Sequence, residues 1–183
     1  MPFRLLGMVV DPDQAGTLCG HTFARYAASG VEVALACAST TGWEPGRVEA
    51  VRRLGVRDVV LLDYPKRELS SPDLERALAD VMTGMRPHVV VVDRHEALAG
   101  VATAAFKLAR RGGGSNGLPA KLYLRASLDS PIPVTTQVGV TGHPSEHFVR
   151  IHPSPWVTGV LETDLFAGIR ELADAAPEQL LAS

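Results

Sequence analysis

The stretch LLGMVVDPDQAG, residues 5–16, decides the fold of this 183-residue chain, because in it a hydrophobic run ends on a proline between two carboxylates. An apolar run of this length is typical of a strand buried on both faces of a sheet. Pro12 has no N–H and holds the preceding residue extended, so the strand is expected to end at Asp11. A helical pattern follows, and the unit therefore places polar side chains at the carboxyl edge of a sheet, where open α/β proteins build their sites.

The same alternation of strand and helix continues along the chain. Apolar runs of strand length occupy residues 31–38, 56–63 and 88–92, and helical patterns occupy residues 45–54, 72–86 and 97–110. Gly30 and Gly55 are expected to end the helices that precede them, and Ser71 is expected to cap the helix that begins at Pro72. This alternation predicts an α/β fold, with a parallel sheet and helices on both of its faces.

The pattern changes after the glycine-rich run at residues 112–117, which is interpreted as a mobile loop. Three short strands without intervening helices are expected at residues 121–126, 134–140 and 147–151. A final helix is expected from Ser154 to about Ala173, because Leu161, Leu165, Ile169 and Leu172 fall at helical spacing. Neither an internal repeat nor a second domain is visible, so residues 1–183 are expected to form one domain.

Composition and charge exclude several classes of protein. The formal net charge of −2 gives no electrostatic reason to expect nucleic acid or an anionic membrane as a partner. The apolar runs are far shorter than the roughly 20 residues that span a bilayer, and no signal peptide is expected, because the first strand begins almost at once. Cys19 and Cys37 match no metal or redox spacing and are expected to be free, buried thiols. A cytoplasmic protein is the simplest interpretation.

The first motif resembles that of a known family. The segments DPDQA at residues 11–15 and CGHTFA at residues 19–24 align without a gap to the HPDDE and CGGTLA segments of the LmbE-like (PIG-L) de-N-acetylases. Weaker similarity to the family extends over residues 54–65, 85–92, 120–124 and 157–170, which together with the first motif span most of the chain. The resemblance implies a Rossmann-like α/β fold.

The resemblance also implies a zinc-dependent amide hydrolase, but several site positions differ. Asp11 stands at the position of a zinc-binding histidine, Gln14 at that of a zinc-binding aspartate, and Asp13 at that of the general base. The third zinc ligand of the family follows the fourth strand, where the matching position here is Glu96 or Ala97 and His95 is the nearest imidazole.

Two interpretations of these residues stay open. In one, a metal site is rebuilt from Asp11, Gln14 and His95 or Glu96, with Asp13 as the base, and the chain deacetylates an amino-sugar conjugate. Carboxylate and amide oxygens would favour a harder ion than zinc. In the other, these residues form a polar rim without a metal, which binds an amino-sugar-like small molecule or a partner. A homo-oligomer is compatible with either, and we expect weak or absent zinc binding and very low deacetylase activity.

Three further polar positions have competing roles. Asp13 could instead cap the helix that follows it, a position where aspartate is favoured. His21 is expected on the surface of that helix. The segment HPSEH at residues 143–147 superficially resembles the family's HPDH motif, but its place in the chain and its proline favour a loop.

Overall fold

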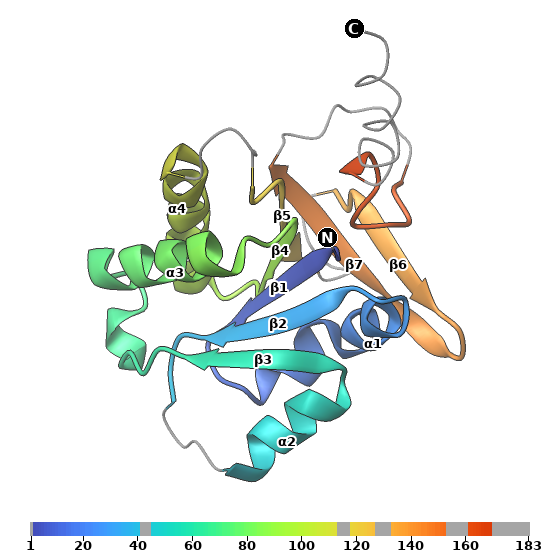
Figure 1. Ribbon diagram of the computed structural model, residues 1–183, viewed down its shortest axis with the longest axis horizontal. Helices are drawn as coiled ribbons and strands as arrows, with labels where there is room; N and C mark the ends of the chain where they lie inside the picture. Colours follow the sequence, from blue (N-terminus) through green and yellow to red (C-terminus); the bar gives the residue numbers. More distant parts are fainter. Residues whose placement is uncertain (1, 41–44, 113–117, 127–132, 153–160, 170–183) are drawn as a thin grey trace, which may run out of the picture.

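Seven strands form a single mixed sheet in the computed structural model, which describes residues 2–40, 45–112, 118–126, 133–152 and 161–169 (Figure 1). The order across the sheet is β3-β2-β1-β4-β5-β7-β6. The strands are β1 (Arg4–Val9), β2 (Glu32–Cys37), β3 (Val56–Leu61), β4 (Val89–Val92), β5 (Lys121–Arg125), β6 (Thr136–Val140) and β7 (His143–His152). Strands β1 to β5 are parallel, β7 is antiparallel to β5, and β6 is antiparallel to β7. The predicted parallel arrangement of the first four strands is confirmed.

Four helices cover the two faces of the sheet, which confirms the α/β class. They are α1 (Gln14–Ala28), α2 (Pro45–Arg53), α3 (Pro72–Met85) and α4 (Glu96–Gly112), and a short 3-10 helix η1 (Lys66–Glu68) follows β3. One buried core joins the sheet to α1 and α2, and a second joins it to α3 and α4 (Figure 1). Within the described parts of the chain, no helix combines the length and the hydrophobicity that crossing a bilayer requires.

Local signals read from the sequence fix several helix ends. Ser71 caps α3 by accepting a hydrogen bond from the backbone N–H of Leu74 at 3.2 Å. Gly55, which follows α2, has φ +83, and a Cβ at this position would lie 2.5 Å from the Cβ of Ala27. Glycine is therefore required at position 55 both by the left-handed backbone and by the close approach of α1.

Two segments differ from the prediction. Residues 162–168 form turns and an isolated bridge between Glu162 and Thr136 instead of a helix, because polar groups of the sheet bind the side chain of Glu162. Ile169 is helical, whereas residues 154–160 and 170–173 of the predicted helix and residues 113–117 of the predicted loop lie outside the described residues. The loop predicted at residues 143–147 is wrong: these residues begin β7 and pair with β6, which satisfies their backbone.

Helix α1 is kinked, and the kink is held by a residue distant in the sequence. Cys19 has the non-helical angles φ −163 and ψ 48. Just beyond it, the backbone N–H groups of His21 and Thr22 donate to the carboxylate of Glu146 on β7, at 3.3 and 2.9 Å. The imidazole of His21 stacks on that of His143, with the ring centroids 4.0 Å apart. The hairpin of β6 and β7 is thus joined to the middle of α1.

Candidate functional site

The carboxyl ends of β1 and β4 meet at the point where the direction of the chain across the sheet reverses. From β1 the chain continues to β2 on one side, whereas from β4 it continues to β5 on the other. The backbone N–H of Asp93, just after β4, donates to the carbonyl of Met8 in β1 at 2.9 Å. The segments 11–14 and 93–96 therefore leave the sheet from neighbouring strands, at the switch point where open α/β sheets bind ligands.

Asp11 is the most buried of the predicted site carboxylates. Its side chain is 15% exposed, and its Oδ2 lies 2.8 Å from the ammonium of Lys66, a residue of η1. Its Oδ1 is buried and has no hydrogen-bond partner among the described residues. A buried acceptor without a donor costs about 1–3 kcal/mol, so this oxygen requires a donor that the described residues do not supply.

Gln14 has a structural role at this edge. Its Oε1 accepts hydrogen bonds from the backbone N–H groups of Val10 and Asp11, both at 3.1 Å. The side chain therefore reaches back from the first turn of α1 and fixes the turn that leads into it. Because two backbone donors already bind this oxygen, it is poorly placed to bind a metal.

Asp13 lies at the rim of the site. It occupies the N-cap position of α1, but its side chain makes no capping hydrogen bond, so the capping role is not observed. Its carboxylate forms an ion pair with Arg47 of α2 instead. Both carboxylates of the DPD segment are thus paired with cations from segments that follow β2 and β3.

The residues after β4 are more exposed. Asp93 Oδ1 accepts a hydrogen bond from the backbone N–H of Arg94 at 2.8 Å. His95 and Glu96 are exposed, and Glu96 opens α4. Among the described residues, no three side chains of His, Cys, Asp or Glu are grouped so that they could hold a metal ion. A structural or catalytic zinc needs at least three such ligands, so this donor set does not fit zinc.

Lys66 and Arg47, the two cations that bind the carboxylates of the DPD segment, were not predicted from the sequence. Neither residue is of a type that the zinc site of the family would use. The position of Lys66 could have indicated its role, because Lys66 follows the third strand and the turn after it. The segments that follow parallel strands lie at the same edge of the sheet.

Both cysteines are buried free thiols, as predicted. Burial raises the pKa of the Cys37 thiol to about 12, and the nearby carboxylate of Asp11 adds to the effect. Burial also raises the pKa of Cys19, with a further contribution from Glu146. Neither thiol is therefore poised to act as a nucleophile at neutral pH.

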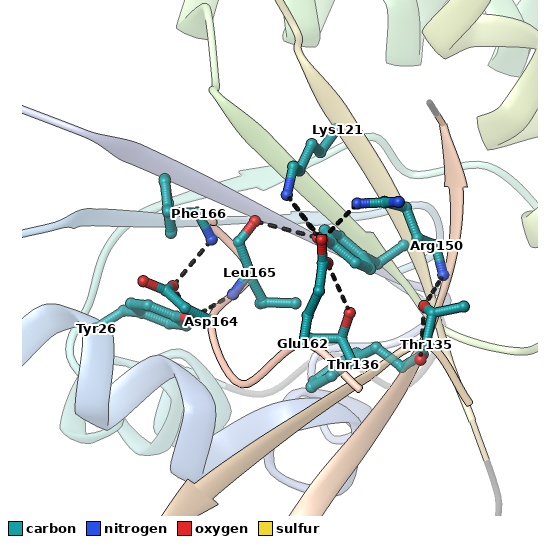
Figure 2. Close-up of polar contacts among 11 residues, drawn as sticks. Tyr26, Lys121, Thr135, Thr136, Arg150, Glu162, Asp164, Leu165 and Phe166 are labelled. Atoms are coloured by element: carbon teal, nitrogen blue, oxygen red, sulfur yellow. Dashed lines mark hydrogen bonds and ion pairs between the residues drawn. The ribbon is translucent and has the colours of Figure 1, made fainter. Parts of the chain in front are cut away.

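A second polar cluster, here called the Glu162 cluster, consists of Glu162 and the side chains that bind its carboxylate, namely Lys121, Tyr123, Thr136 and Arg150 (Figure 2). The carboxylate of Glu162 is 2.6 Å from Arg150 on β7 and 3.8 Å from the buried ammonium of Lys121 on β5. Thr136 and Tyr123 donate hydrogen bonds to its other oxygen, each at 3.2 Å. Burial raises the pKa of Tyr123, and the negative charge of Glu162 raises it further, so the phenol stays protonated.

The neighbouring residues of the same segment bind α1 (Figure 2). The hydroxyl of Tyr26 donates to Asp164 Oδ1 at 2.7 Å and accepts from the backbone N–H of Leu165 at 2.8 Å. Asp164 Oδ1 also accepts from the backbone N–H of Phe166 at 2.9 Å. These contacts fix residues 162–166 against the sheet and α1, and they point to a structural role.

Comparison with known proteins identifies the fold. No protein-family model and no curated protein matches the sequence. Among solved structures, the conserved protein TT1542 from Thermus thermophilus is 27% identical over 73% of this chain and 70% of its own, with a TM-score of 0.61. The N,N′-diacetylchitobiose deacetylase from Pyrococcus horikoshii is 18% identical, with a TM-score of 0.57, and the match covers 66% of this chain but 59% of the deacetylase.

A third structure shows that this fold is not restricted to deacetylases. The 4-carboxy-2-hydroxymuconate hydratase GalB from Pseudomonas putida is 20% identical, with a TM-score of 0.55, over 68% of this chain and 66% of its own. The chain has the fold that these proteins share, and one of these structural neighbours is a deacetylase. The Rossmann-like fold and the resemblance to the LmbE-like de-N-acetylases, both predicted from the sequence, are thereby confirmed.

Proposed function

We propose that this chain uses the deacetylase fold to bind a small, hydrogen-bond-donating molecule at the carboxyl edge of β1, and that it has lost zinc-dependent amide hydrolysis. The observation that carries the proposal is the environment of Asp11. One carboxylate oxygen is bound by the ammonium of Lys66, and the other is buried without a donor among the described residues.

The charges at this edge argue against zinc. Lys66 already places a positive charge 2.8 Å from the carboxylate that stands at a zinc-ligand position. A dication bound to the same carboxylate would be repelled by this ammonium, or would have to displace it. The amide oxygen of Gln14 is bound by two backbone donors, and His95 and Glu96 are exposed at the start of α4.

The unpartnered oxygen of Asp11 defines the chemistry of the ligand. It requires a donor, such as a hydroxyl or an ammonium group, and a hydrogen bond to a carboxylate is worth more than one between neutral groups. Ion-paired Asp13 and Arg47 at the rim offer further acceptors and donors to a polar molecule. An amino sugar presents several hydroxyl groups and an amine within a small volume, and it is therefore the ligand class that we favour.

Calorimetric titration with glucosamine and N-acetylglucosamine, together with metal analysis of protein purified without chelator, tests the proposal. We expect binding of at least one sugar and zinc well below one equivalent. Asp11→Asn should weaken the binding by about ten-fold, or about 1.4 kcal/mol. The matched control is Asp80→Asn, which changes an exposed aspartate on α3 and should leave binding unchanged.

Two outcomes would contradict the proposed function. Stoichiometric zinc, together with chelator-sensitive deacetylation that Asp13→Asn abolishes, would establish the hydrolase with a rebuilt metal site instead. Equal affinity of the wild type and Asp11→Asn for both sugars would remove the assigned role of Asp11.

A further inference from the structure

A cavity of about 270 Å³ lies at the opposite end of the sheet from the Asp11 site. It is formed by the amino-terminal parts of β1, β2 and β3 and by the C-terminal end of α3. Pockets for drug-sized ligands usually measure roughly 300–1,000 Å³, so this cavity suits a compact molecule.

The floor of the cavity is apolar on β1 and β2 and carries one carboxylate, that of Asp58, on β3. Leu6, Ala34 and Asp58 occupy one row across β1, β2 and β3, since Leu6 pairs with Ala34 and Ala34 with Asp58. Leu6 and Ala34 belong to the core beneath α3, and Met85, the last residue of α3, packs against that core. Ala34 carries only a methyl group, and a larger side chain at this point of the floor would occupy space that the cavity leaves open.

The charged groups of the lining are paired, with one exception. Arg4 Nε lies 3.0 Å from one oxygen of Glu32, and Arg57 lies 3.1 Å from the other. Arg4 also donates to the backbone carbonyl of Met85 at 3.0 Å. No described residue forms an ion pair or a hydrogen bond with the side chain of Asp58, which lines the same cavity. Asp58 is therefore the charged group of the lining that a ligand can engage without first breaking a contact.

We propose that this cavity binds a small organic cation, with a primary ammonium group at Asp58 and a compact apolar body against Leu6, Ala34 and Met85. An anion would have to compete with Glu32 for Arg4 and Arg57, so the lining favours a cation.

Titration of 13C-alanine-labelled protein with n-butylammonium, followed by NMR of the Ala34 methyl group, tests the proposal. We expect a saturable shift of this signal and binding of the isosteric n-butanol that is at least about two-fold weaker. Asp58→Asn should weaken butylammonium binding by about two- to five-fold, the size expected for a partly exposed ion pair. Ala34→Leu should abolish binding by filling the floor, and Asp80→Asn on the exposed face of α3 should leave binding unchanged.

The proposal fails if butylammonium produces no saturable shift at Ala34, or if butanol binds as tightly as butylammonium. It also fails if Asp58→Asn binds butylammonium with unchanged affinity. Asp58 is exposed, so this variant keeps the fold and gives a decisive result even if Ala34→Leu unfolds. The outcome does not depend on the carboxyl-edge site, because Asp11 and Asp58 lie at opposite ends of the sheet.

Discussion

The carboxyl edge of β1 and the Glu162 cluster both bring opposite charges together, but they differ in how completely these charges are satisfied. At the carboxyl edge, Asp11 has one ion pair with half-exposed Lys66 and one buried oxygen without a partner among the described residues. In the Glu162 cluster, both carboxylate oxygens are bound, and the cations have low exposure. Within the described part of this cluster, the group that still lacks a partner is the buried Nε of Arg150.

This difference separates a candidate ligand-binding site, at Asp11, from a structural cluster, around Glu162. A carboxylate that is saturated by the protein has nothing left to offer a ligand, and its loss leaves buried cations uncompensated. A carboxylate that is paired with a cation that water reaches contributes little to folding, and its unpartnered oxygen is the one to which we assign the ligand's donor. We therefore expect changes in the Glu162 cluster to affect stability, and changes around Asp11 to affect binding.

The largest effect is expected for Glu162→Gln. The change leaves Lys121 and Arg150, whose side chains are 7% and 14% exposed, without their carboxylate. We expect a loss of roughly 2–4 kcal/mol in the free energy of unfolding, somewhat below the loss for a fully buried pair. Urea unfolding measures it, with Glu68→Gln, which breaks an exposed pair with Arg67, as the control. Equal losses in the two variants would contradict the assigned structural role.

Acidification should lower the stability of the protein through His88 and His152, which lie at the amino end of the parallel strands. Burial lowers the pKa of both, and Arg4 adds to the effect at His88, whose Nδ1 accepts the backbone N–H of Arg4 at 3.2 Å. Below about pH 6.5, the unfolded state therefore binds more protons than the folded state. The contribution of the two neutral histidines to the free energy of unfolding is complete above about pH 6.5 and is lost as the pH falls below it.

Urea unfolding at pH 7.5 and 5.5 measures this loss. His88→Asn should reduce it, because an asparagine oxygen can accept the same N–H without titrating in this range. His95→Asn, at an exposed position of the carboxyl edge, is the control and should leave the pH dependence as it is in the wild type. A wild-type stability that rises on acidification would contradict the expected direction of the pH dependence.

Lys66→Met tests the carboxyl edge of β1, where we expect effects on binding more than on stability. Because Lys66 is 56% exposed, its loss should reduce stability by only about 0.5–1 kcal/mol. The variant should bind zinc more tightly than the wild type, since the ammonium no longer competes for Asp11. Competition with a chromophoric chelator measures this, with the exposed Lys107→Met as the control. Unchanged zinc affinity would show that Lys66 does not oppose the metal.

The smallest effect is expected from salt. Between 0.05 and 0.5 M NaCl, the coupling energy between Asp11 and Lys66 should fall by a few tenths of a kcal/mol, because the ammonium of Lys66 is exposed and salt screens it. The coupling between Glu162 and Arg150 should fall less, since both side chains are mostly buried. Double-mutant cycles at the two salt concentrations measure both values. A larger decrease in the Glu162 pair would reverse the comparison.

The sequence predicts the fold well because its signals are local. Apolar runs mark the parallel strands, and Gly55 and Ser71 mark helix ends through their own backbone and side-chain chemistry. The helical spacing of Leu161 and Leu165 failed as a signal because contacts of Glu162 with distant strands outweigh local preference.

The candidate site was predictable only in position. The end of the first strand places residues 11–14 at the carboxyl edge, and the pairing of β1 with β4 brings the segment 93–96 beside it. The partners of Asp11 and Asp13 depend on where η1 and α2 come to lie, which spacing alone does not encode. The hydrogen bonds of Gln14 likewise depend on the geometry of the turn.

The kink of α1 has a consequence for the order of folding. The N–H groups of His21 and Thr22 are satisfied by Glu146, a residue more than 120 positions later in the chain. The middle of this early helix therefore cannot be completed until the hairpin of β6 and β7 has docked. Contacts of such long sequence separation slow folding, because the chain must close a large loop before it gains them. An N-terminal fragment that ends before β6 should thus contain a frayed α1, and this helix should form late although its residues are synthesised first.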